Sequence, residues 1–250
     1  MTPALETQGL SRSFGAVAVA DGIDFRLAPG ARHALIGPNG AGKTSFVNLV
    51  TGALRPSAGR IRLDGTDITG LAQAERVRRG IVRSFQITSL FRGLSVLENV
   101  VLAVTERHGA GGGMLRAAGR RGALIAEAYA LLDQFGIAAE ASRPLRALPY
   151  GRQRMVEMAV ALALRPRVLL LDEPAAGVPA ADSGLIVAAI ERLPPDIAVL
   201  IIEHDLDLVF RLARAITVLV AGRILVEGTP EAIAADPRVR AVYLGERHRA

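Results

Sequence analysis

The stretch that decides the fold of this chain reads Gly37-Pro38-Asn39-Gly40-Ala41-Gly42-Lys43-Thr44. A glycine-rich loop followed by Lys-Thr is the P-loop, whose backbone N–H groups and following helix N-terminus attract a polyphosphate. Lys43 is the single lysine among the 30 basic residues. A compact ammonium can enter such a loop as a point charge, whereas a planar guanidinium is too broad. The sequence therefore predicts a nucleotide-phosphate site.

The residues on either side of this loop supply the context that the motif requires. Residues 34–36 are apolar and predict a buried strand, and residues 45–50 predict the helix that follows the loop. Further along the chain, short strand-like runs alternate with helical stretches, which indicates an α/β fold with a mainly parallel core sheet. Residues 5–10, 23–27 and 59–65 predict an antiparallel β edge region.

Composition limits the classes of function. The chain has 250 residues and no cysteine, which excludes disulfides and Cys-ligated metals. No apolar run approaches the roughly 20 residues that span a bilayer, and the N-terminus lacks a signal-peptide pattern. The net charge of +6 comes from arginines that are spread along the chain, and only three tyrosines and no tryptophan are available for base stacking. We therefore expect no direct nucleic-acid binding.

Strand signals disappear between about residues 87 and 164, where helical periodicity dominates. We interpret residues 1–250 as one domain whose helical subdomain, residues 87–164, is inserted into the α/β core. Thr229-Pro230 and Asp236-Pro237 are both N-cap/N1 pairs, which predict a short C-terminal helical tail over about residues 229–250. Residues 106–122 are rich in glycine and arginine. They are interpreted either as a solvated loop or as a contact with anionic headgroups or membrane subunits.

Carboxylates stand at the end of a second apolar run, Leu169-Leu170-Leu171-Asp172-Glu173. Asp172 can hold Mg²⁺ through water, and Glu173 is placed to orient or deprotonate an attacking water. Their simpler interpretation is a strand-end turn with solvated acids. His204 ends the next apolar run; alone it would indicate a structural histidine. One strand after Asp172 and Glu173, it is predicted to contact the γ-phosphate.

Together these motifs resemble the ATP-binding-cassette (ABC) family over essentially the whole chain. The family signature corresponds to Leu148-Pro149-Tyr150-Gly151-Arg152, just before a helix. Family cassettes pair head to tail, so Tyr150 and Gly151 would cap the nucleotide held by the partner's P-loop. Pro149 stands where many members carry serine and offers neither hydroxyl nor N–H. Pro179 stands in the D-loop where a polar residue is usual.

The resemblance also implies roles for single residues, with ATP and Mg²⁺ as the cofactors. Gln86 matches the glutamine that contacts Mg²⁺ and the lytic water, and Phe14 matches the aromatic that stacks on adenine. Thr44 would ligate Mg²⁺ together with Asp172 and Gln86, and Ser45 would contact phosphate. The predicted catalytic residues are Glu173, His204 and Gln86. The predicted nucleotide-binding residues are Gly37, Pro38, Asn39, Gly40, Ala41, Gly42, Lys43, Thr44, Ser45, Phe14, Tyr150 and Gly151.

Within the family, the Leu-Pro-Tyr-Gly signature and Ile202-Glu203-His204-Asp205 look like the branched-chain amino-acid importer group. The tail from Glu227 resembles both this group and lipopolysaccharide-export ATPases. The resemblance implies an ATP-hydrolysing subunit that powers a membrane importer for branched-chain or similar amino acids or amides. The alternatives are a lipopolysaccharide or lipid export ATPase, or an ABC ATPase outside transport.

The implied partners are a second cassette (self or sister), two membrane-spanning permease subunits and, indirectly, a substrate-binding protein. The implied location is peripheral, on the cytoplasmic face of the inner membrane.

Overall fold

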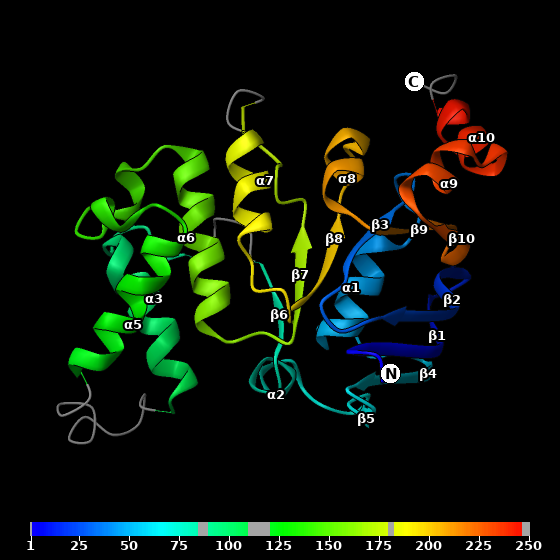
Figure 1. Cartoon of the computed structure of the whole chain (residues 1–250). Coiled ribbons are helices and arrows are strands. Elements are labelled where there is room, and N and C mark those ends of the chain that lie inside the picture. Colours follow the sequence, from blue (N-terminus) through cyan, green and yellow to red (C-terminus); the bar gives the residue numbers. More distant parts are fainter. Residues whose placement is uncertain (1, 85–89, 110–120, 180–182, 247–250) are drawn as a thin grey trace. The chain divides into compact units, whose positions relative to one another are not determined.

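The computed structural model describes residues 2–84, 90–109, 121–179 and 183–246 (Figure 1). The chain divides into two compact units, each described here by itself. The first comprises Met1–Ile81, Arg167–Glu173 and Pro195–Ala250, and the second comprises Val82–Pro166 and Pro174–Pro194. Among the described helices, none is both long and apolar enough to cross a bilayer.

An antiparallel sheet opens the first unit. Its strand order is β2-β1-β4-β5, with every described pairing antiparallel. Leu5 pairs with Leu27 on one side and Leu63 on the other, so one buried residue from each of three strands meets at one end of the sheet. The strands are β1 (Leu5–Phe14), β2 (Val17–Leu27), β4 (Ala58–Leu63) and β5 (Thr66–Asp67). The predicted antiparallel region is confirmed.

The core sheet has the order β10-β9-β3-β8-β7-β6. The pairs β9–β3, β3–β8 and β8–β7 are parallel, whereas β10 pairs antiparallel with β9. Continuous apolar runs such as the fully buried β8 suit a sheet covered on both faces. The strands are β3 (Arg32–Ile36), β6 (Ile81–Arg83), β7 (Val168–Asp172), β8 (Ala198–Ile202), β9 (Ala215–Val220) and β10 (Arg223–Gly228). The predicted mainly parallel core is confirmed.

Helix α1 (Lys43–Thr51) packs its apolar face into the largest core cluster of this unit through Phe46, Val47 and Leu49. Its C-terminal end is bound by the buried Arg76 of α2 (Gln73–Arg78). The Arg76 Nη1 atom donates to Leu49 O at 2.7 Å and to Val50 O at 2.9 Å. A cation at a helix C-terminus complements the helix dipole, so Arg76 stabilises the helix that follows the P-loop.

Three more helices complete the first unit: α8 (Leu206–Leu212), α9 (Pro230–Ala235) and α10 (Pro237–Glu246). The Thr229 side chain caps α9 by accepting a hydrogen bond from the Ala232 N–H at 3.3 Å. The Asp236 carboxylate accepts from the Arg238 N–H at 2.8 Å at the start of α10. Short polar side chains before a proline thus fix both helix starts.

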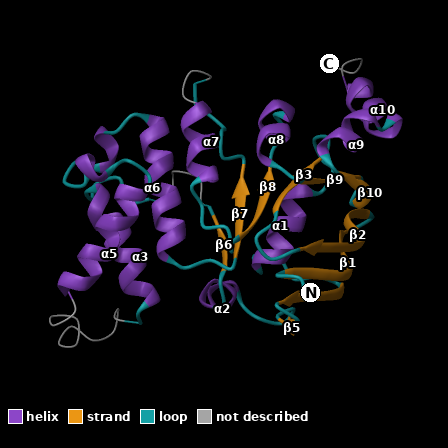
Figure 2. Cartoon of the chain, viewed as in Figure 1, coloured by secondary structure: helices purple, strands orange, loops and turns teal. Residues whose placement is uncertain are grey.

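The described part of the second unit is mostly helical (Figure 2). Its helices are α3 (Val96–Arg107), α5 (Arg121–Gln134), α6 (Tyr150–Ala163) and α7 (Ser183–Glu191), with short 3₁₀ turns at Ala138–Glu140 and Leu145–Ala147. Ser95 and Glu98 form a capping box that starts α3. Buried residues on α3, α5 and α6, such as Val100, Leu132 and Val156, form its core. Much of the glycine- and arginine-rich segment, residues 110–120, lies outside the described residues.

Candidate nucleotide-binding and hydrolysis site

The P-loop follows β3 and leads into α1 in the first unit. At two of its glycines, a backbone oxygen of a neighbouring strand lies too close to leave room for a side chain. A Cβ on Gly37 would lie 2.1 Å from Leu219 O, and one on Gly42 would lie 2.4 Å from Val19 O. Both positions also have positive φ, which favours glycine. The loop therefore bends against β2 and β9 in a way that a side chain would prevent.

Lys43 is the first residue of α1, and its side chain turns back over the loop. The Lys43 Nζ atom donates to Gly37 O at 2.5 Å and to Pro38 O at 3.0 Å. Thr44 and Asn39 are exposed, and Ser45 is half-buried in the first turn. The loop and the α1 N-terminus thus gather one ammonium, two hydroxyls and the first N–H groups of a helix. This donor set suits a polyphosphate.

The predicted catalytic side chains lie at the same edge of the core sheet. Leu35 of β3 and Asp172 of β7 both pair with Ile202 of β8 in parallel register. The residues that follow these strands therefore emerge side by side, beginning with Gly37 and Glu173. His204 Nδ1 lies 3.6 Å from Glu173 Oε1. The structure thus brings the P-loop, Asp172, Glu173 and His204 to one edge.

Glu173 has an unusual backbone conformation for a residue other than glycine. Its φ is +47°, in the left-handed region. Such a conformation costs on the order of 1–2 kcal/mol and often marks a functional position. The Glu173 N–H donates to Ile202 O at 2.8 Å, which holds the backbone in place. Its side chain is half exposed and open to solvent.

Glu203 is not among the predicted site residues, yet it lies directly beside His204. Its side chain is 2% exposed, and Glu203 Oε2 is 3.8 Å from His204 Nδ1. The same oxygen accepts a hydrogen bond from the His204 N–H at 3.1 Å. A carboxylate between an apolar strand and a histidine is a sequence signal that could have identified it. Glu203 therefore positions the backbone and ring of His204.

Phe14 lies at the tip of the β1–β2 hairpin, opposite Val17. Its ring is 51% exposed, and the Arg12 guanidinium lies 4.9 Å from the ring centroid. The β2 strand passes the P-loop at Val19, whose carbonyl closely approaches Gly42. An exposed aromatic ring on this hairpin is suited to stacking on a base. The predicted contact of Phe14 with adenine stays a prediction.

Tyr150 and Gly151 belong to the second unit, where they begin α6. The N-cap residue is Pro149, and no side chain caps this end of the helix. The Tyr150 ring lies 5.4 Å from the Arg154 guanidinium and packs beside Gly177, where a Cβ would be 3.1 Å from the tyrosine oxygen. Arg154 Nη2 also donates to Ala176 O at 3.2 Å. The signature segment is therefore connected to the D-loop segment of the same unit.

The predicted Mg²⁺ ligands are Gln86, Thr44 and Asp172. Gln86 lies outside the described residues. Within the described ranges, no group of three or more His, Asp or Glu side chains gathers as a metal site. Magnesium in nucleotide sites takes few protein ligands, because waters and phosphate oxygens complete its shell. Thr44 and Asp172, one hydroxyl and one half-buried carboxylate, fit that pattern.

Comparison with known proteins identifies the family. Residues 20–176 match the family model described as ABC transporter, and residues 223–249 match the one described as branched-chain amino acid ATP-binding cassette transporter. The chain is 38% identical to the high-affinity branched-chain amino acid transport ATP-binding protein BraF of Pseudomonas aeruginosa, over 98% of both chains. It is 36% identical to the corresponding protein LivG of Escherichia coli, again over 98% of both. The ADP conformation of MJ1267, an ATP-binding cassette of an ABC transporter, aligns with a TM-score of 0.84 and 29% identity, covering 98% of this chain and 100% of that one.

The fold and the phosphate loop define a P-loop nucleotide-binding protein. The chain belongs to the ABC transporter family, and it is an ATP-binding cassette of the transport ATPase type. The predicted family and enzyme class are confirmed.

Proposed function

We propose that this chain is the ATP-hydrolysing subunit of a membrane importer for branched-chain amino acids or similar small amino acids and amides. The observation that carries the proposal is the sheet edge where the P-loop meets Glu173 and His204, 3.6 Å apart. The full-length similarity to branched-chain amino acid transport proteins supports the class of cargo.

The phosphates of ATP would be held by the P-loop. Lys43 exchanges its bonds to the Gly37 and Pro38 carbonyls for phosphate oxygens, and the α1 N-terminus donates backbone N–H groups. Thr44 and Asp172 would hold Mg²⁺, with Gln86 as the further proposed ligand. When bound, Mg²⁺ neutralises charge that develops on the transferring phosphoryl group.

Glu173 would accept a hydrogen bond from the attacking water and orient it for in-line attack. Its half-exposed carboxylate can reach that water, while its backbone stays fixed to Ile202. His204 would donate to the γ-phosphate, since Glu203 fixes its backbone. Catalysis is then mainly positioning and electrostatic stabilisation.

Tyr150 and Gly151 would cap the nucleotide of a second cassette, which is either another copy or a sister subunit. Both cassettes would sit peripherally on two membrane-spanning permease subunits at the cytoplasmic face of the inner membrane, and a substrate-binding protein would deliver the cargo. Closure of the pair around ATP and its reopening after hydrolysis would drive these subunits.

Reconstitution tests this function. The chain, assembled with the membrane subunits that copurify with it in proteoliposomes, should drive ATP-dependent uptake of leucine, isoleucine or valine. The same complex with Glu173→Gln should assemble but transport nothing, and Glu231→Gln on α9 serves as the matched control. ATP-dependent movement of lipid without amino-acid uptake would contradict the proposed importer and support a lipid export ATPase.

A further inference from the structure

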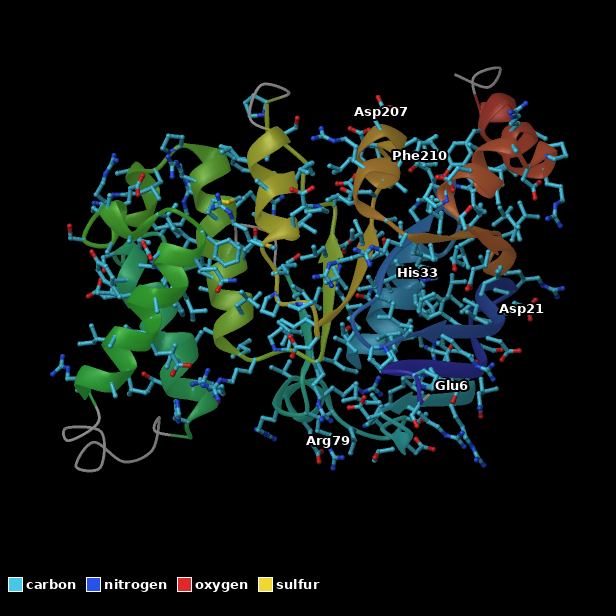
Figure 3. The ribbon with its side chains drawn as sticks, viewed as in Figure 1. Glu6, Asp21, His33, Arg79, Asp207 and Phe210 are labelled. Atoms are coloured by element: carbon cyan, nitrogen blue, oxygen red, sulfur yellow. The ribbon has the colours of Figure 1, made fainter. Side chains whose placement is uncertain are left out.

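A pocket of about 480 Å³ lies in the first unit among α8, α9 and α10. Phe210, labelled in Figure 3, stands on α8 at this pocket. The pocket is lined by Ile36, Leu206, Phe210, Ile233, Ala234, Val239, Arg240 and Tyr243. Its volume falls within the roughly 300–1,000 Å³ of small-molecule sites.

The lining combines an apolar interior with one positive charge. Ile36, Ile233 and Val239 are buried, and Phe210 is 37% exposed, a high value for a large apolar side chain beside a pocket. Arg240 is the one charged side chain among these described lining residues, and none of them carries a carboxylate. A ligand with an aliphatic body and a single negative head would complement this lining, whereas a zwitterion would leave its ammonium without an acidic partner.

The Arg240 guanidinium is held at this wall. Its Nε atom donates to Ala234 O at 3.0 Å, and Ala234 is itself a lining residue. Within the described residues, no carboxylate lies in ion-pair distance of Arg240. Arg238, two residues earlier on α10, differs because its Nη2 atom lies 2.7 Å from Asp236 Oδ2. The charge of Arg240 is therefore the one suited to a ligand.

Three lining residues lie close in sequence to residues of the candidate nucleotide site. Ile36 directly precedes Gly37, the first residue of the P-loop. Leu206 and Phe210 come from α8, which begins after His204 with Asp205 as its N-cap. The other five lining residues fall within 223–249, the part of the chain that matches the branched-chain cassette model. The C-terminal segment thus builds a pocket against β3, which leads to the phosphate loop, and α8, which follows the histidine.

We propose that this pocket binds an aliphatic monocarboxylate of medium chain length. The chain body lies along Ile233, Val239 and Phe210, and the carboxylate pairs with the Arg240 guanidinium. The site is separate from the nucleotide site, and the proposal does not depend on which cargo the transporter moves.

Calorimetric titration of the full chain with octanoate tests the proposal, with octanamide as an uncharged ligand of the same shape. Octanoate should bind at least about tenfold more tightly than octanamide, because the amide lacks the charge-assisted bond to Arg240. Arg240→Gln should remove this preference. Ala234→Leu should weaken both ligands by filling the pocket.

Arg238→Gln is the matched control, because it removes one arginine from the same helix without changing the lining. MgATP affinity should be unchanged in all three variants, which checks that each one folds. Absent octanoate binding, equal affinity for octanoate and octanamide, or octanoate binding that survives both Arg240→Gln and Ala234→Leu would overturn the proposal.

Discussion

Each unit of the molecule buries an arginine, and the two are satisfied in different ways. Among the described residues, Arg76 in the first unit donates to backbone carbonyls alone, at Leu49, Val50, Thr69 and Leu71. Arg154 in the second unit pairs with the buried Glu157 carboxylate at 2.7 Å. Burial lowers the pKa of Arg76 and raises the pKa of Glu157 above its ordinary value. Burial therefore disfavours both charged forms, and the hydrogen bonds of each group offset part of this cost.

The difference shows what each arginine supports. Arg76 closes the C-terminal end of the P-loop helix by donating hydrogen bonds to its last carbonyls. Around Arg154, the buried Arg154 Nε, Glu157 Oε1 and Gln153 Oε1 atoms make no hydrogen bond within the described part of the chain. Within the described residues, each Arg76 side-chain nitrogen thus has a hydrogen-bond partner, whereas helix α6 contains buried polar atoms that have none.

Arg76→Met gives the largest expected loss of stability. The variant removes a donor shared by four carbonyls, of which those of Leu49 and Val50 belong to buried residues, and we expect the free energy of unfolding to fall by about 4 kcal/mol. Denaturant unfolding followed by circular dichroism measures the change. Arg78→Met, on the exposed side of the same helix, should change stability by less than about 0.5 kcal/mol. If Arg76→Met lowers the free energy of unfolding no more than Arg78→Met does, Arg76 does not stabilise the P-loop helix as described.

Arg154→Met should reduce the free energy of unfolding by about 3 kcal/mol, because Glu157 is left buried without its partner. Arg154→Met combined with Glu157→Met should recover most of that loss, since an apolar pair fills the same space without desolvated charge. Within the described residues, Arg76 donates to backbone carbonyls and to no carboxylate, so the same kind of second substitution has no counterpart there. If the double variant is as unstable as the single one, the two arginines do not differ as described.

The two regions should also differ in their contribution to MgATP binding, with a smaller change in free energy than the stability changes above. Lys43→Ala should weaken MgATP binding to the isolated chain by about 2 kcal/mol, or roughly 30-fold, because a charge-assisted bond to phosphate is lost. Tyr150→Ala should leave that affinity unchanged, since its proposed contact is with the nucleotide of a second cassette. Fluorescence titration with a nucleotide analogue distinguishes the two. Equal weakening in both variants would place Tyr150 at the nucleotide of its own chain.

The smallest expected effect is a pH dependence from His33 in the first unit. Its ring is buried beside Phe25 and lies 2.8 Å from Thr217 Oγ1, and Thr217 donates to Glu227 at 3.0 Å. Burial lowers the pKa of His33 from 6.5, although Glu227 opposes the shift. The unfolded chain then binds more protons than the folded one below about pH 6.5, so stability falls as the pH is lowered through that value. The slope is at most about 1.4 kcal/mol per pH unit.

His33→Gln removes the titrating group and keeps a donor near Thr217. The pH dependence of its unfolding midpoint between pH 7 and 5 should be flatter than that of the wild type. An unchanged slope would assign the dependence to other groups.

The local sequence was enough to predict the position of the phosphate loop and of the strands that lead to it and to Asp172. Gly37, Lys43 and Asp172 belong to motifs whose spacing carries the chemistry, and the apolar runs before them predicted the parallel strands. The buried charges could not be read in this way, because burial of Arg76 or Arg154 depends on elements far apart in the chain. Glu203 was not predicted as a site residue, although its place between an apolar run and His204 is a local signal; its hydrogen bond from the His204 N–H is seen only in the structure.

The central claim is that the sheet edge with Glu173 hydrolyses ATP. The most direct measurement is the steady-state rate of phosphate release from MgATP, compared among wild type, Glu173→Gln and the surface control Glu231→Gln, at nucleotide concentrations that saturate binding. We expect wild type and Glu231→Gln to turn over alike, and Glu173→Gln to bind MgATP with wild-type affinity while releasing almost no phosphate. Wild-type turnover in Glu173→Gln would contradict the claim.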